Sequence, residues 1–170
     1  MAVIMEHADL LQTIAQISIA FAGFAGVVAA FSKFRLDPEA AIFRIRLMVV
    51  VALVTLLFSL FPLLPPNFGL SESDSWRISA FLFSLTIISI SIWSWVRLRF
   101  LYQAGLLNTQ KITIVWYLAA VILIIALFVT ISGRIDSFTP AIYITALFFG
   151  LALCSFYFIM LIVAVELEKG

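Results

Sequence analysis

Few residues in this chain carry groups that could do chemistry, and the most reactive cluster lies near its start. His7 is the only histidine, and it lies with Glu6 and Asp9 in the stretch EHAD. A three-ligand metal site is conceivable there, but successive helical residues point about 100° apart, so His7 and Glu6 face different directions. We interpret the cluster as solvated charge and predict neither a metal site nor a cofactor.

The long apolar stretches contain no acid–base groups. Between residues 47 and 96, and between residues 112 and 165, charged side chains occur only in or beside two polar connections. A charge at bilayer depth costs about 3 kcal/mol or more, a cost that proton-coupled carriers accept because the charged group performs the transport. This pattern argues against a proton-driven transporter and against acid–base catalysis, so we predict a protein that is not an enzyme and has no catalytic residue. Cys154 is the only cysteine, which excludes an internal disulfide.

Hydroxyl groups are concentrated in residues 76–96, but they do not form a single stripe. Ser79, Thr86 and Ser89 share one face of a helix, whereas Ser84 and Ser91 lie nearly opposite. A hydroxyl in an apolar medium can donate a hydrogen bond to the carbonyl four residues earlier. We therefore predict that these groups bond to their own backbone and support helix packing, rather than line a polar conduit.

The composition indicates which elements carry these residues. Of the 170 residues 65% are apolar and 11% charged, and the mean hydropathy is +1.22, whereas soluble domains are about half apolar and about a quarter charged. A helix of about 20 apolar residues spans a bilayer. Five stretches qualify, namely 10–31, 43–64, 76–96, 112–131 and 141–165. We predict an all-α integral membrane protein, a compact bundle of five transmembrane helices that forms one domain over residues 1–170 without a soluble domain.

The basic residues predict the orientation of this bundle. If the five stretches alternate in direction, eight of the ten Lys and Arg residues fall on one side. Cytoplasmic loops hold the excess of positive charge. We therefore predict a bacterial-type cytoplasmic (inner) membrane, with the N-terminus outside and the C-terminus in the cytoplasm. If the first stretch lay in the interface instead of crossing, both termini would be cytoplasmic.

Seven of these eight basic residues are predicted to contact anionic lipid. They are Lys33, Arg35, Arg44, Arg46, Arg97, Arg99 and Lys111. The same ring could instead dock an anionic ligand or an acidic partner. We predict no nucleic-acid partner, because no basic cluster is interleaved with exposed aromatic residues.

Aromatic and proline residues mark the predicted helix ends. The aromatic residues expected at the headgroup boundary are Trp76, Trp93, Trp95, Trp116 and Tyr117. Pro62 lies just inside the end of the second stretch and has no N–H to donate. We expect the Phe58 carbonyl to lose its helical partner and the helix to bend at this point.

The first stretch is unusual because nine of the eighteen residues from 14 to 31 are Ala, Gly or Ser. On a helical wheel its bulky residues form one stripe, and small or polar residues lie opposite. Helices associate in lipid through close backbone approach, which rows such as Ala22-xxx-Gly26-xxx-Ala30 permit. We expect a central helix, matched by the row Ala146-xxx-Gly150-xxx-Cys154 in the last stretch. The residues predicted to pack helices or line a pore are Gln12, Ala15, Gln16, Ala22, Gly23, Gly26, Ala30, Ala146, Gly150 and Cys154.

Two interpretations of this small-residue face stay open. It is either a packing seam, within one chain or between identical chains, or the lining of a pore in an oligomer. Residues 14–31 resemble in texture the Gly/Ala-packed pore helix of small-conductance mechanosensitive channels, a likeness of about eighteen residues without a specific motif.

We predict a homo-oligomeric channel or pore-type protein whose partners are the lipid bilayer and further copies of itself. A non-catalytic accessory or scaffold subunit of a larger membrane complex is the alternative. A lipid-active enzyme or carrier is a more remote one, because the apolar stretches lack acidic groups.

Overall fold

The computed structural model of the chain describes residues 2–31, 38–103, 110–132 and 138–167. Five long helices occupy these ranges: α1 (Ala2–Phe31), α2 (Pro38–Leu60), α3 (Glu72–Gln103), α4 (Gln110–Ile131) and α5 (Thr139–Leu167). Two short 3₁₀ helices, η1 (Phe61–Leu63) and η2 (Pro65–Phe68), connect α2 to α3. Each long helix contains a stretch long and apolar enough to cross a membrane. The prediction of an all-helical chain with five such helices is confirmed over the described residues.

The helix termini follow local sequence signals. α2 begins at Pro38 with Glu39 in its first turn, and α5 begins at Thr139 followed by Pro140, as expected for a proline at the start of a helix. Ser71 caps α3, because its hydroxyl oxygen accepts a hydrogen bond from the Asp74 amide at 3.1 Å.

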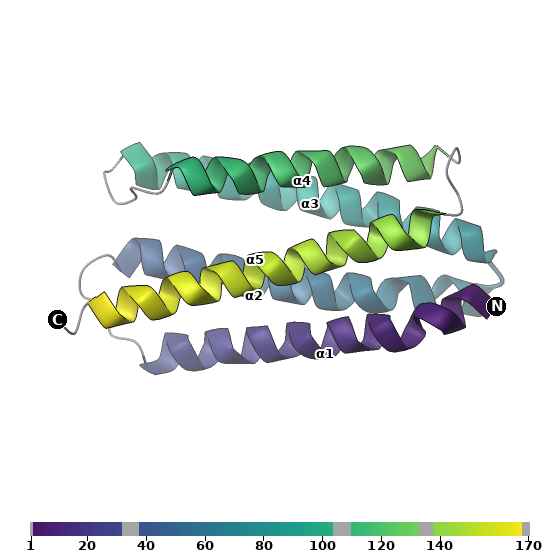
Figure 1. Cartoon of the computed structure of the whole chain (residues 1–170), viewed down its shortest axis with the longest axis horizontal. Helices are drawn as coiled ribbons and strands as arrows, with labels where there is room; N and C mark the ends of the chain where they lie inside the picture. The colour runs from purple at the N-terminus through teal and green to yellow at the C-terminus, as the bar shows by residue number, and fades with distance from the viewer. Residues whose placement is uncertain (1, 32–37, 104–109, 133–137, 168–170) are drawn as a thin grey trace.

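The helices form two groups. α1 and α5 both pack against α2, and α3 packs mainly against α4. Figure 1 shows α1 at one edge of the bundle, beside α2, while α5 crosses the middle and α3 and α4 lie on the far side. α1 runs along α2 over its length, so it is a member of the bundle and not a helix lying across its end. The expectation that the first helix is central is wrong for a single chain, because α2 and α5 occupy that place.

The outer surface is more apolar than that of a soluble protein, and the buried residues include several hydroxyl groups. The polar side chains among the buried residues are all hydroxyls: Ser18, Thr55, Ser59, Ser75, Ser79, Ser84, Ser94, Thr130 and Thr139. Large apolar side chains face outward instead, and on α4 the exposed fraction reaches 64% for Val115 and 66% for Ile122. Soluble monomers rarely expose apolar surface on this scale. The outer surface is therefore suited to an apolar medium.

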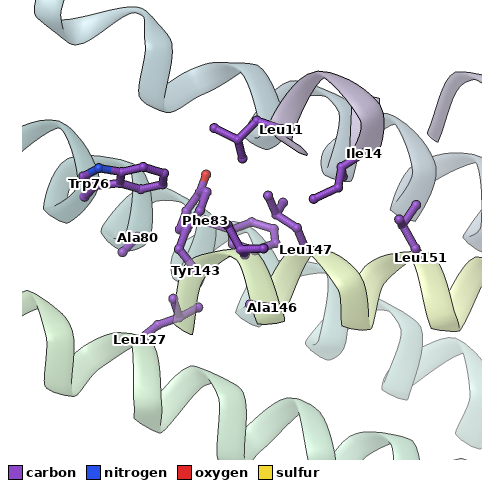
Figure 2. Packing of buried hydrophobic residues seen from close by; sticks show 11 residues of the cluster. Leu11, Ile14, Trp76, Ala80, Phe83, Leu127, Tyr143, Ala146, Leu147 and Leu151 are labelled. Atoms are coloured by element: carbon purple, nitrogen blue, oxygen red, sulfur yellow. The ribbon is translucent and has the colours of Figure 1, made fainter. Parts of the chain in front are cut away.

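The largest core cluster joins four helices at the end of the bundle near the N-terminus (Figure 2). Leu11 and Ile14 of α1 meet Trp76 of α3 and Tyr143 of α5, with Leu127 of α4 on the opposite side. The expectation that Trp76 is a boundary anchor is wrong, because only 2% of it is exposed. Its ring packs edge-on against Tyr143, with ring centroids 5.6 Å apart. A large ring at a helix end can fill the core as readily as it can anchor in headgroups.

Candidate functional site

The small residues of α5 hold it close to α2. A Cβ placed on Gly150 would lie 2.5 Å from the Thr55 Oγ1 atom, which is too short for a real contact. One turn further on, the Cys154 thiol donates a weak hydrogen bond to the Met48 carbonyl at 3.6 Å. Ala146, Gly150 and Cys154 are all buried. Gly150 and Cys154 therefore pack α5 onto α2, and Cys154 also shares a core cluster with Ala25 of α1. The match of this row with the row on α1 stays a prediction.

A proline just after the end of α2 leads to a further contact between α2 and α5. α2 ends at Leu60 and tightens into η1, which contains Pro62. Because proline has no backbone N–H, Pro62 cannot donate a helical hydrogen bond to the Phe58 carbonyl. That carbonyl instead accepts a hydrogen bond of 2.6 Å from the Tyr143 hydroxyl of α5. The prediction that Pro62 interrupts the helix is confirmed, and α5 satisfies the carbonyl that we expected to be unpaired.

α1 presents two different sides. The side toward its neighbours carries Leu11, Ile14, Ala15, Ser18 and Ala25, all of which are buried. The side turned away from the bundle, which we call the open face, carries Gln12, Gln16, Ile19, Gly23, Gly26 and Ala30, all of which are exposed. A Cβ placed on Gly23 or Gly26 would meet no atom within 4 Å. Ala22 lies between the two sides and is half-buried.

The open face is therefore not used within one chain. Ala25 of α1 lies in one core cluster with Met48 of α2 and Cys154 of α5, and Ala22 packs against this cluster. Gly23 and Gly26 are exposed instead. The bulky stripe is divided in the same way, because Ile14 is buried and Phe24 is 55% exposed. Hydrophobicity could not separate the two sides of α1, because each carries both apolar and polar residues.

The hydroxyls of α3 behave as predicted. Ser79, Ser84, Thr86 and Ser89 each donate a hydrogen bond to the carbonyl four residues earlier, at 2.6 to 2.9 Å. Ser94 differs because it also meets another helix, with its Oγ 2.6 Å from the Tyr117 hydroxyl of α4. Because Ser94 donates to the Ser91 carbonyl, Tyr117 is the donor in this pair.

A partly open cavity of about 90 Å³ lies between the α2–α5 seam and the α3–α4 pair. Small residues at Ala120 and Gly150 leave the space, and rings such as Phe83, Trp116 and Phe149 form its sides. Its polar side chains are the hydroxyl-bearing Thr55, Ser91, Ser94, Tyr117 and Tyr157, together with the indole of Trp116. Sequence reasoning missed this cavity, because it arises from the spacing between helix pairs and not from any single motif.

The basic residues of α2 and α3 meet at one end of the bundle, which we call the basic end and define by Arg44, Arg46, Arg97 and Arg99. The Arg97 guanidinium lies 3.9 Å from the Glu39 carboxylate, and both side chains are about half exposed, so the pair adds little stability. Arg44 is half-buried and lies within electrostatic range of Tyr157. Lys33, Arg35 and the side chain of Lys111 lie outside the described residues.

In the described part of the cluster near the N-terminus, His7 makes an aromatic contact. The His7 ring is half-buried and packs edge-on against Trp76, with centroids 6.2 Å apart. Within the part of the chain that the structure describes, no three His, Cys, Asp or Glu side chains are placed to share a metal ion. His7 therefore extends the aromatic core toward the N-terminal end.

Comparison with protein-family models, with curated proteins and with solved structures found no match for this chain.

Proposed function

We propose that this chain is an integral membrane protein that acts as a homo-oligomeric channel or pore-type protein, with the open face of α1 directed toward other copies. The proposal includes five crossings of a cytoplasmic membrane, with the basic end in the cytoplasm and the N-terminus outside, because positive charge is retained on the cytoplasmic side. The observation that carries it is the open face itself, on which two glycines and two glutamines lie outside the bundle.

Small residues in a lipid-facing position gain nothing from the lipid, but they permit close approach of a second helix. Gln12 and Gln16 add polar amides to the same face, about two to four turns before Gly23 and Gly26. Amide groups exposed to acyl chains are costly, and a second helix or water would satisfy them. Several α1 helices around one axis would place the amides toward the outside and a narrow glycine ring toward the cytoplasm.

The cavity found within the described part of one chain is less suited to ion conduction. The cavity between the helix groups is lined mainly by apolar side chains, and the α3 hydroxyls named above bond to their own backbone. Polar groups that already have partners hydrate a pathway poorly. A conducting path therefore needs more than one copy, which is why the proposal places it at the α1 faces.

The test is ion release from liposomes that contain the purified protein. We expect the wild-type protein to release a trapped ion faster than empty vesicles do, and Gly26→Leu to abolish release by obstructing the close approach of α1 helices. Ala152→Leu is the matched control, because Ala152 is also small and exposed but lies on α5. Wild-type release no faster than from empty vesicles would contradict the pore.

The native mass in lipid nanodiscs tests the oligomer separately. We expect a symmetric multiple of the 18.9 kDa chain, reduced in Gly26→Leu and unchanged in Ala152→Leu. Co-purification of a different polypeptide in fixed ratio after mild-detergent extraction would instead identify an accessory subunit of a larger complex.

A further inference from the structure

The cavity between the two helix groups is a separate feature, and its dimensions restrict what it could hold. Its volume of about 90 Å³ is smaller than the ~150 Å³ of an engineered cavity that accommodates benzene. A fused ring system would not fit, whereas a short segment of a hydrocarbon chain would, with the rest of the chain outside the cavity. Because the cavity is partly open, such a chain could enter from the surroundings of the bundle.

The lining favours an apolar occupant over water. Val54, Phe83, Ala120 and Phe149 supply apolar walls from four different helices. The hydroxyls of Tyr117 and Ser94 are already engaged, because Tyr117 donates to Ser94 and Ser94 donates to the Ser91 carbonyl. A buried water needs two to four polar partners, and this part of the wall has its donors occupied.

Positive charge lies at one end of the cavity. Leu47, Ser94 and Tyr157 form that part of the lining, and Arg97 follows Ser94 by one helical turn. Arg44 precedes the cavity-lining Leu47 by three residues, about one turn of α2. A ligand whose chain fills the cavity would therefore extend toward two guanidinium groups, which favour carboxylate and phosphate.

We propose that this cavity binds one hydrocarbon chain of an anionic amphiphile, with its carboxylate or phosphate head at Arg44 and Arg97. This chemistry is shared by an acyl chain of an anionic phospholipid and by a free fatty acid. The site is contained in one chain, so it does not depend on the proposed pore.

Trp116 in the cavity wall provides the readout. In a Trp93→Phe, Trp95→Phe background, emission comes only from Trp116 and from Trp76, which is buried elsewhere. The full chain is reconstituted in phosphatidylcholine vesicles with increasing amounts of one brominated probe: phosphatidylglycerol, phosphatidylcholine or stearate. We expect quenching that saturates at a low mole fraction for an anionic probe, and only a gradual rise for brominated phosphatidylcholine.

Variants separate the cavity from the bulk lipid. Ala120→Phe fills the cavity and should abolish the saturable quenching, whereas Ala152→Phe, on the exposed side of α5, should leave it unchanged. If Ala120→Phe fails to fold, Leu153→Phe narrows the cavity from α5 at a half-buried position outside the small-residue row.

The head site has its own matched pair. Arg44→Gln should weaken binding of the anionic probe about fivefold, the effect of one cation near the surface, whereas Arg77→Gln, near the start of α3 and outside the basic end, should not. Saturable quenching by only one of the two anionic probes, phosphatidylglycerol or stearate, supports the site and shows whether the ligand is a phospholipid or a free fatty acid. Quenching that is linear, equal for the anionic and zwitterionic lipids, and unaffected by either cavity-filling variant would overturn the proposal.

Discussion

α1 and α5 both carry rows of small residues, and the structure uses them in opposite ways. On α5 the row Ala146, Gly150 and Cys154 is buried against the rest of the bundle. On α1 the corresponding glycines, Gly23 and Gly26, have open space where a side chain would lie. A row of small residues is thus buried inside the bundle in α5, whereas in α1 the glycines are exposed on the outside of the bundle.

Substitutions on α5 should therefore affect folding of one chain, whereas substitutions at the α1 glycines should affect contacts between chains. The α5 row sets the distance between α5 and α2, so a larger residue there should damage the protomer itself. The α1 glycines contact nothing in the protomer, so a larger residue there should leave the fold intact and change only what α1 meets outside it.

The largest expected effect follows from Gly150→Ala. The added methyl group would overlap the Thr55 hydroxyl, and we expect the free energy of unfolding to fall by about 1–3 kcal/mol, as for other overpacked cores. Reversible unfolding in mixed micelles, followed by circular dichroism, measures this loss.

Two further variants make the comparison specific. In Gly150→Ala/Thr55→Ala most of the loss should be recovered, because the group that obstructs the methyl is removed. Gly23→Ala should be neutral or stabilising by up to ~1 kcal/mol, since alanine is the better helix former. Equal losses for Gly150→Ala and Gly23→Ala would show that α1 and α5 do not differ in the way described.

A smaller effect is expected for the bond that joins α5 to the end of α2. Tyr143→Phe keeps the ring contacts with Trp76 and Phe83 but removes the donor to the Phe58 carbonyl. We expect this substitution to lower the free energy of unfolding by about 1 kcal/mol. In a Pro62→Ala background the restored N–H at residue 62 can serve that carbonyl, so the same substitution should cost less. If Tyr143→Phe lowers the free energy of unfolding equally in both backgrounds, the Phe58 carbonyl does not depend on Tyr143 because of Pro62.

The smallest effect distinguishes two serines of α3. Ser94→Ala removes a hydrogen bond to another helix, and we expect a loss of about 0.6 kcal/mol, the average for such bonds in membrane proteins. Ser84→Ala removes only a bond to the same helix and should change stability less. The unfolding free energies of the two variants decide the point, and the reverse order would be inconsistent with the hydrogen bonds described.

The sequence allowed prediction of the helices but not of their contacts. Hydropathy located all five, although α1 and α3 extend beyond the predicted limits of 10–31 and 76–96. Hydropathy identifies only the apolar part of a helix. The helix can continue beyond that part, because polar residues that are good helix formers also adopt helical structure. Pro62 predicted the break in α2 because its effect is local to the backbone.

The choice of neighbours could not be predicted because both sides of each helix are apolar. In a soluble protein a hydrophobic stripe identifies the buried face, but here Leu11 is buried while Leu10 and Phe24 are exposed. Trp76 and the cavity were missed for a similar reason, since both depend on how α3 lies against helices distant in sequence.

The most direct measurement is cross-linking between copies through the open face of α1. In a Cys154→Ala background, cysteine is introduced by Gly26→Cys or, as the control, by Ala152→Cys on the exposed side of α5. Membranes are treated with a short bifunctional maleimide, and the products are separated by size. We predict covalent dimers for Gly26→Cys and none for Ala152→Cys. Monomer alone for Gly26→Cys, in protein that reacts fully with a monofunctional maleimide, would contradict an α1 face directed toward other copies.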